Sequence, residues 1–585
     1  MPNIIRKPES IKVLDLVSMI RQNKVSLPDF QREFVWHPKQ MALLVESILM
    51  HYPTGTPMFL KYDLNLTMGK RSFVGTDPSA FTPEHYVIDG QQRLFTLLKL
   101  FTTPENLAPL DSLEHNGKYY KIYYHANTRP DTFEIDEDKP TFICPEVFPH
   151  EKHVHAEEDE HYLSLGKRRL IPIEFIASEP HTDMWLKKAL GHVSNETREA
   201  CKENILEVRR RIETYTCNIE KIESKLRPED HYKIFQLLNE AGTDLTVFDL
   251  LVAKLSPLGI NLRTLWKKCQ ADYPGFKKNN FDLDPTYILR TISLIKRTKN
   301  EDDESQPTCT KKDLKHLYRE YKTDAQWAAS RFENDWGTAC RYINESLEDF
   351  RLRYGAISKK YVPYSPMIVT LAAIKWWYDQ QHYNQKYRFR VQDKLDKWYW
   401  GSVFGQEYES STDTVIANHY YNLRKWIPPF GNRIIPKEIN FKMTNKSEIK
   451  EMIQEITTSA DARYKAIICL PLRGDSKAKD IYSEAYLESK CLQDHHIFPR
   501  AFLKKSGYSD NELINNVANR MLITSTTNTS ISDQSPYEYL KHVKRSTTLS
   551  KHHLFKEIFI ENMSFEDFVD ERTDRLSADV YRLVN

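Results

Sequence analysis

The chain has 585 residues, of which 40% are hydrophobic and 28% charged, and its formal net charge is +2. This length exceeds what one hydrophobic core organises, so two or three domains are expected. Because the charge is nearly balanced, the surface as a whole is not basic. Any binding of nucleic acid must therefore come from local patches of positive charge.

Eight cysteines are scattered along the chain without a CxxC pair, a pattern that indicates reduced thiols and argues against a zinc ribbon or a disulfide scaffold. Only 17 glycines are present, and neither a Walker A nor a Rossmann fingerprint occurs. No apolar run is long enough to span a membrane, and the first ten residues lack the apolar core of a signal peptide. We therefore expect a cytoplasmic protein without membrane contact.

The N-terminal region begins with an amphipathic helix predicted near residues 11–20. The next segment, "VSLPDFQREFVW", places polar Gln31 and Arg32 inside an apolar run, which indicates that they point into a site. A helix is predicted from His37 to a stop at Pro53, because apolar residues recur at helical spacing. The sequence then predicts a strand in "GTPMFLKYDL" and a variable loop or hairpin up to about residue 84.

The sharpest local pattern of this region is "HYVIDGQQRLFTLLKLF", which predicts a buried strand, a turn and an amphipathic helix. Asp89 can cap that helix, and Gln92 can complete a capping box. Gln91 and Arg93 have no part in such a cap. A helix N-terminus with an arginine beside it also suits a phosphate group, so a structural cap and a phosphate site both remain open here.

The middle of the chain contains "HEKHVHAEEDEH" at residues 150–161, which reads as a solvated charged loop or as a metal site. A long helix near residues 196–215 and a following strand in "IEKIESK" are predicted. Residues 297–313 are polar and charged and predict a linker. From about residue 314 to 435 the chain is helical and rich in aromatic residues.

These aromatic residues have two interpretations. They fit the core of a helical bundle, and they also fit a platform that stacks a flipped or modified base, because basic residues lie between them. The aromatic residues are Trp376, Trp377, Tyr378, Trp398, Tyr399 and Trp400, and the basic ones are Lys375, Lys386, Arg388 and Arg390.

The C-terminal region contains "DHHIFP", with His495 and His496, followed by Asn519 in "VANRMLI" and Asn528 in "TSTTNTS". Two histidines that close one strand, an asparagine at a second strand and an asparagine at a helix start form a distinctive layout. Since adjacent strand residues point to opposite faces, both imidazoles can serve one site only if the strand ends or kinks at this pair.

That layout resembles the HNH, or ββα-metal, nuclease finger. The resemblance implies that His496 is the general base, that Asn519 orients it, and that His495 and Asn528 bind a metal ion. An amide-oxygen ligand suits a hard cation, so Mg²⁺ or Mn²⁺ is expected. Asp494 is either a residue that orients His496 or a part of the strand, and Asn516 lies close enough to Asn519 to be confused with it.

The N-terminal motifs resemble the DGQQR domain of the GmrSD-type restriction endonucleases, whose core is similar to the ParB and sulfiredoxin fold. The resemblance rests on "LPDFQREFVW", "VIDGQQR" and "YKIFQLLNEAGTDLTVFDLLVAKL" in this order. It implies binding and hydrolysis of an NTP, with ATP, GTP and CTP not distinguished. The implied nucleotide-binding residues are Gln31, Arg32, Asp89, Gly90, Gln91, Gln92 and Arg93.

Together these features predict a mostly helical α+β multidomain protein. The expected domains are a ParB-like NTP-binding domain at 1–255, a helical middle region at 256–440 and an HNH nuclease domain at 441–585. The resemblance implies an NTP-responsive, metal-dependent endonuclease of the type IV restriction kind that cleaves double-stranded foreign DNA, such as modified phage DNA. The alternatives are a nucleotide-dependent DNA-binding sensor that does not cut and a toxin-like nuclease that acts on host nucleic acid. The sequence leaves the oligomeric state open, a homodimer included.

Overall fold

The computed structural model divides the chain into two compact units, Met1–Asn261 and Leu262–Asn585. The expected division at residues 255 and 256 lies near this boundary, and the one at 440 and 441 falls inside the second unit. The structure describes residues 5–28, 31, 34–62, 69–74, 76–102, 113–115, 118–129, 143–148, 159–223, 246–277, 280–298, 308–322, 325–384, 387–410, 412–428, 445–474, 478–487, 492–560 and 563–585.

The first unit is built on a six-stranded mixed sheet with the strand order β1-β10-β3-β5-β2-β4, and β2 runs parallel to β5. A second sheet contains β6, β7 and β8, with β9 paired to β7. The strands are β1 (Ile5–Lys12), β2 (Val25–Pro28), β3 (Met58–Lys61), β4 (Lys70–Arg71), β5 (His85–Asp89), β6 (Leu113–His115), β7 (Lys118–His125), β8 (Ile143–Phe148), β9 (Leu170–Pro172) and β10 (Thr216–Glu223).

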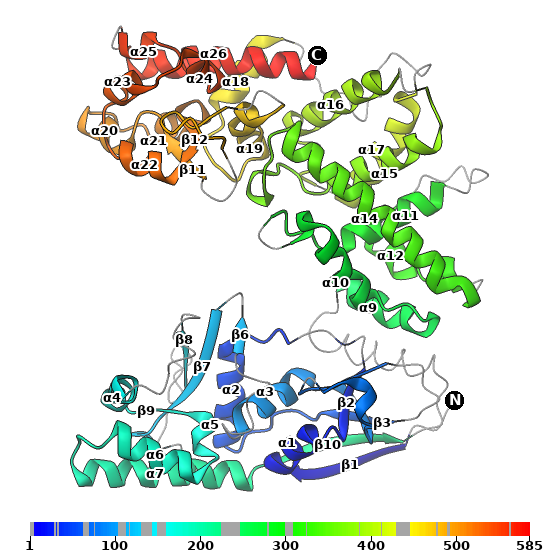
Figure 1. Cartoon of the computed structure of the whole chain (residues 1–585), viewed down its shortest axis with the longest axis vertical. Coiled ribbons are helices and arrows are strands. Elements are labelled where there is room, and N and C mark those ends of the chain that lie inside the picture. The colour runs from blue at the N-terminus through cyan, green and yellow to red at the C-terminus, as the bar shows by residue number, and fades with distance from the viewer. Residues whose placement is uncertain are drawn as a thin grey trace. The chain divides into compact units, whose positions relative to one another are not determined.

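Helices pack on the main sheet of this unit and on one another, with contacts that join α1, α2, α3, α5 and α7 (Figure 1). Their apolar faces and the strands enclose one core that includes Val13, Leu94 and Trp185. The helices are α1 (Val13–Arg21), α2 (Pro38–Leu49), α3 (Gln91–Phe101), α4 (Asp159–Arg168), α5 (Ile173–Ile176), α6 (Glu179–Ala189), α7 (Asn195–Thr214) and α9 (Val247–Leu255).

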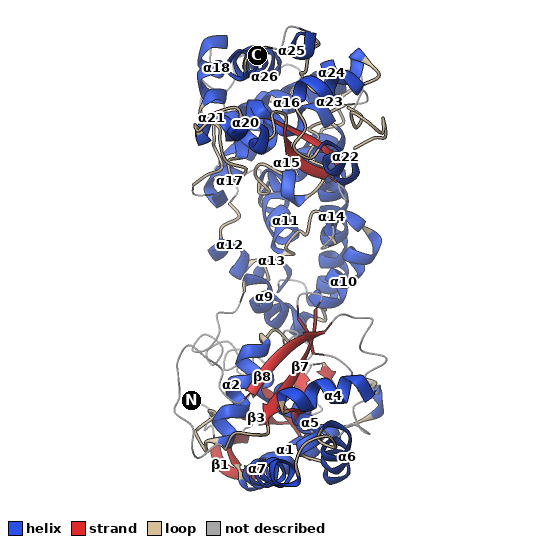
Figure 2. Cartoon of the chain, turned by 90° about the vertical axis from the view of Figure 1, so that its left-hand side faces the viewer, coloured by secondary structure: helices blue, strands red, loops and turns tan. Residues whose placement is uncertain are grey.

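The second unit is helical except for one antiparallel strand pair in its described residues, which lies among helices (Figure 2). That pair is β11 (Leu492–His496) and β12 (Arg520–Thr524). The helices before it are α10 (Leu262–Asp272), α11 (Thr286–Thr298), α12 (Lys311–His316), α13 (Arg319–Lys322), α14 (Ala328–Leu352), α15 (Met367–Gln380), α16 (Arg388–Phe404), α17 (Thr412–Trp426), α18 (Lys446–Gln454) and α19 (Ala462–Cys469). The later ones are α20 (Arg500–Lys505), α21 (Asn511–Asn515), α22 (Ser525–Ile531), α23 (Pro536–Tyr539), α24 (Ser546–Lys551), α25 (Glu557–Ile560) and α26 (Phe565–Val584).

The mostly helical α+β class expected from the sequence is confirmed, and the predicted helices near residues 11–20, 37–53 and 196–215 are present as α1, α2 and α7. The linker predicted at 297–313 does not separate the two units, because both its flanking helices, α11 and α12, belong to the second unit. The Ser293 hydroxyl donates to the Thr308 carbonyl across 2.9 Å, which holds the two ends of this segment together.

The aromatic stretch of the middle region forms a helical core, as the first of its two interpretations expected. Trp376, Trp377, Trp398, Tyr399 and Trp400 are all at most 8% exposed, so stacking a base on these five side chains is excluded. The Tyr399 ring stacks on Tyr354 with a centroid distance of 3.6 Å. Tyr378 is half-buried and is the exception.

Among the described residues, six cysteines are free and buried, as expected for reduced thiols. None of the described helices is long and apolar enough to cross a membrane.

Helix α16 offers a matched test of this core. Trp398 is 1% exposed and donates its indole N–H to His419 across 2.9 Å, whereas Phe389 on the same helix is 85% exposed. We expect Trp398→Ala to lower the free energy of unfolding by about 3–5 kcal/mol, and Phe389→Ala to change it by less than about 0.5 kcal/mol. Urea denaturation followed by far-UV circular dichroism measures both, and similar values for the two variants would contradict this packing.

Candidate functional sites

The C-terminal histidines and asparagines lie on a strand pair followed directly by a helix. β11 and β12 are antiparallel, with His496 opposite Arg520 and His495 opposite Met521. Strand β11 ends at His496, and α22 begins right after β12. The strand ends directly after the histidine pair, and both histidines still belong to the paired strand.

His495 and Asn528 are in direct contact: the His495 Nδ1 and Asn528 Oδ1 atoms are 2.8 Å apart. The imidazole is 6% exposed, and burial lowers the pKa of His495 to about 4, so the ring is neutral at pH 7. Its Nε2 atom is buried and has no hydrogen-bond partner among the described residues. A neutral imidazole nitrogen and an amide oxygen at this separation are ligand types that can bind one cation.

His496 has a different set of neighbours. Its Nε2 lies 3.1 Å from Asn515 Oδ1, and Arg520 Nη1 lies 2.6 Å from both ring nitrogens. Burial, followed by the positive charge of Arg520, lowers the pKa of His496. The imidazole is therefore held neutral and able to accept a proton. In the described residues the two histidines share no hydrogen-bond partner.

Asp494 lies on the same side of β11 as His496, since the two residues are two positions apart in the strand. It accepts from Arg520 Nε at 2.8 Å and from the Tyr464 hydroxyl at 2.6 Å. The Asp494 carboxylate thus fixes the guanidinium that faces His496, and Asp494 is itself part of β11.

Asn519 is fully buried and bonds only backbone groups in the described residues. Its Oδ1 accepts from the Phe498 N–H at 2.8 Å, and its Nδ2 donates to the carbonyls of Ile514 at 2.9 Å and Phe498 at 3.3 Å. It therefore holds the chain just after His496 and positions the imidazole through the backbone. Asn516 instead donates to the Ile453 and Gln454 carbonyls, so the two asparagines have distinct roles.

Two further residues that the motif does not include support this arrangement. The Tyr539 hydroxyl donates to the Ile497 carbonyl at 2.6 Å, next to His496. The fully buried Asp480 carboxylate receives six hydrogen bonds, from Tyr482, Ser483, Thr524 and Thr527, and so fixes the start of α22. No local pattern in the sequence identifies Asp480, because its main partners lie more than forty residues downstream.

The N-terminal motif forms a strand, a turn and a helix, as predicted. Gly90 between β5 and α3 has a φ of 91°, and a Cβ there would approach Pro57 Cβ to 3.0 Å, so glycine is required. The capping alternative for Asp89 and Gln92 is wrong, because Gly90 is the N-cap residue of α3. Asp89 pairs with Arg93 across 3.0 Å instead.

The side chains around this turn connect neighbouring segments. Arg93 Nη1 donates to the Thr54 carbonyl at 2.8 Å, and Gln92 Oε1 accepts from the Val35 N–H at 2.8 Å. Gln31 Nε2 donates to the Val87 carbonyl at 2.7 Å, while its buried Oε1 has no partner among the described residues. Arg32 lies outside the described residues.

The structure thus brings Gln31, Asp89, Gly90 and Arg93 around the carboxyl end of β5. Gln91 and Gln92 are buried in the first turn of α3. Their roles in nucleotide binding remain predictions.

The third N-terminal motif and the histidine-rich segment are described only in part. Thr246 caps α9 by accepting from the Asp249 N–H at 3.1 Å, whereas Phe235, Asn239 and Gly242 lie outside the described residues. His150, His153 and His155 also lie outside them. Within the part of the chain that the structure describes, no group of three or more His, Cys, Asp or Glu residues is arranged to hold a metal.

We expect Asn519→Ala to destabilise the second unit by about 3 kcal/mol, because three buried backbone groups lose their partner and each costs about 1–3 kcal/mol. The control Asn515→Ala removes a half-buried carboxamide and should cost less than about 1 kcal/mol. Urea denaturation of both variants measures the difference, and an Asn519→Ala protein as stable as the control would refute the positioning role.

Asp480 makes the stability of this unit depend on pH. Burial alone would raise its pKa, but the hydrogen bonds from Thr524, Thr527, Ser483 and Tyr482 outweigh burial and lower the pKa from 3.8 to about 2. Because the folded-state pKa is lowered, the stabilisation is complete above pH about 4 and is lost as the pH falls toward 2.

The ionised Asp480 carboxylate contributes on the order of 2 kcal/mol to the free energy of unfolding. Denaturation at pH 6, 4 and 3 should therefore show a smaller loss of stability on acidification for Asp480→Asn than for the wild type. If the free energy of unfolding falls equally in the two proteins as the pH is lowered, the Asp480 carboxylate makes no such contribution.

Two comparisons with known proteins show what the chain is similar to. Residues 13–256 match the family model described as "GmrSD restriction endonuclease, N-terminal domain". A protein of Methanocaldococcus jannaschii, named as uncharacterized, is 27% identical over 545 residues, which cover 91% of this chain and 86% of that protein. Over residues 13–256 the chain is therefore similar to the N-terminal domain of the GmrSD restriction endonucleases.

Proposed function

We propose that this protein is a metal-dependent DNA endonuclease whose catalytic centre is the unit formed by β11, β12 and α22. One observation carries the proposal: His495 Nδ1 lies 2.8 Å from Asn528 Oδ1 at the point where β11 ends, and the neutral His496 is the next residue. An imidazole and an amide oxygen beside a second neutral imidazole are the groups that hydrolysis of a phosphodiester needs.

The donor set fits a hard divalent cation. Asn528 offers an amide oxygen, and the Nδ1 atom of His495 lies 2.8 Å from that oxygen, close enough for both atoms to contact one ion. Mg²⁺ and Mn²⁺ bind through few protein ligands and keep positions for water and phosphate oxygens. When bound, such an ion would stabilise the charge that gathers on the phosphate.

His496 acts as the general base in this proposal. A neutral imidazole removes a proton from the attacking water, and the leaving oxygen is protonated from solvent. Burial and the Arg520 guanidinium beside the ring both lower the pKa of His496 and keep the imidazole neutral before the reaction, and the guanidinium presents a positive charge to the phosphate. Asn519 and Tyr539 keep the strand end, and hence the ring, in place.

The N-terminal domain would bind an NTP and couple its hydrolysis to cleavage. The turn between β5 and α3 supports this, because the N-cap residue of α3 is Gly90, which has no side chain, and Arg93 stands in the first turn. A helix start of this kind attracts phosphate oxygens. Foreign DNA, including phage DNA with modified bases, is the proposed target. This choice of target rests only on the similarity to the GmrSD restriction endonucleases.

The principal test is cleavage of plasmid DNA with Mg²⁺ or Mn²⁺, with and without NTP, on modified and unmodified substrates. We expect His496→Ala to lower the cleavage rate by about 100-fold or more and to leave NTP hydrolysis unchanged. The control is His542→Ala, an exposed imidazole in the same unit.

A His496→Ala protein that cuts at the wild-type rate would remove the catalytic assignment. A wild-type protein that binds DNA but never nicks it would favour the sensor alternative. Equal cleavage of unmodified host DNA, together with toxicity that needs His496, would favour the toxin-like alternative.

A separate test addresses the nucleotide. We expect Arg93→Ala to weaken binding of fluorescent ATP, GTP or CTP analogues by about tenfold, the loss of one charge-assisted contact. Lys99→Ala, at the other end of α3, should bind as the wild type does. Thermal denaturation must be compared in parallel, because Arg93 also bonds Asp89 and the Thr54 carbonyl. Equal nucleotide binding by both variants would remove Arg93 from the site.

A further inference from the structure

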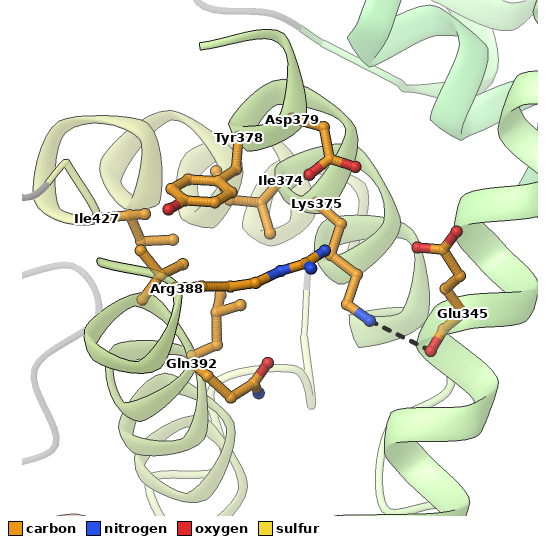
Figure 3. A pocket seen from close by; sticks show the side chains of 10 residues that line it. Glu345, Ile374, Lys375, Tyr378, Asp379, Arg388, Gln392 and Ile427 are labelled. Carbon is orange, nitrogen blue, oxygen red and sulfur yellow. Dashed lines mark hydrogen bonds between the residues drawn. The ribbon is translucent and has the colours of Figure 1, made fainter. Parts of the chain in front are cut away.

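A small cavity lies between α14, α15 and α16 in the second unit, away from the residues assigned above. Its volume is about 110 Å³. The side chains of Ile374, Val391, Leu395 and Ile427 supply its apolar part. In Figure 3, Arg388 reaches between Tyr378 and Gln392 toward Lys375 and Asp379.

The volume limits what the cavity can hold. Sites for drug-sized ligands have volumes of about 300–1000 Å³, and each water takes about 30 Å³ of liquid volume. A cavity of about 110 Å³ therefore accepts one ring-sized group and excludes a whole nucleotide or a peptide segment.

The polar lining presents both donors and acceptors. Lys375 and Arg388 are cationic and Glu345 and Asp379 anionic, so the lining charges balance and favour a neutral occupant. The Tyr378 hydroxyl is buried and has no hydrogen-bond partner among the described residues. A flat neutral ring that carries both donors and acceptors on its edge matches this lining, and a nucleobase is such a group.

The surface beside the cavity bears an unusual side chain. Phe389, one residue after Arg388 at the start of α16, is 85% exposed, the largest fraction among the described large hydrophobic residues. The next residue, Arg390, is also exposed. An exposed aromatic ring can enter a base stack as a wedge, and an arginine beside it can contact the backbone phosphates.

We propose that this cavity binds a single nucleobase turned out of a DNA strand, with Phe389 taking the place of that base in the stack. Arg388 and Asp379 bond the edge of the base, and the Tyr378 hydroxyl supplies a further contact. This inference rests on the proposed function, because it assumes a DNA substrate, and it assigns substrate reading to the helical middle region.

The test uses the full chain carrying His496→Ala, so that DNA is bound without being cut. Duplexes contain 2-aminopurine, whose fluorescence rises when it leaves the stack, next to a central cytosine, 5-methylcytosine or 5-hydroxymethylcytosine. We expect a rise in fluorescence on binding with at least one duplex. Adding Phe389→Ala should remove most of that rise and weaken binding about tenfold, as expected for one base stacked on an aromatic ring. Trp327→Ala, which removes a 58% exposed ring from the same unit, is the matched control and should change neither value.

A second variant tests the cavity itself. Asp379→Asn should change the order in which the three cytosines are bound, which a merely structural residue would not do. Binding seen by anisotropy without a fluorescence rise on any duplex would overturn the inference while leaving cleavage by the wild type intact. A rise that neither Phe389→Ala nor Asp379→Asn alters would overturn it too, as would binding of free cytidine to the cavity without unstacking of DNA. If the wild type neither binds nor cuts DNA, the proposed function fails and this inference fails with it.

Discussion

The carboxamide of Asn519 is the constraint on which the candidate catalytic centre depends. It is fully buried and bonds the backbone on both sides of Phe498, so it ends β11 at His496 and fixes the direction in which the imidazole leaves the strand. The Tyr539 hydroxyl holds the adjacent Ile497 carbonyl. These contacts fix the point at which β11 ends, directly after His496.

The remaining support comes from charged groups placed at a distance in sequence. Asp480 fixes the start of α22, which carries Asn528, and Asp494 fixes Arg520 against His496. The buried Arg572 of α26 donates to the Arg520 carbonyl at 2.8 Å and to the His552 carbonyl at 3.1 Å. The C-terminal helix is therefore part of the scaffold that orders the site, although it supplies none of the proposed ligands.

The sequence predicted those features that depend on neighbours along the chain. The helical periodicity of α1, α2 and α7 and the strand, turn and helix around Gly90 are local, and they were predictable for that reason. The pairing of His495 with Asn528 followed from the motif. The sequence did not reveal Asp480 or Asn515, because their contacts arise only when distant segments pack together. The cap predicted at Asp89 failed because Arg93, one turn later, competes for the same carboxylate.

The proposed catalytic centre requires that His495 and Asn528 hold one divalent ion at the end of β11. Titration of the full chain with Mn²⁺, with bound and free ion distinguished by electron paramagnetic resonance, measures this binding. We expect one bound Mn²⁺ per chain in the wild type and in His542→Ala, with loss of that ion in His495→Ala and in Asn528→Ala. An unchanged count in the last two variants would contradict it.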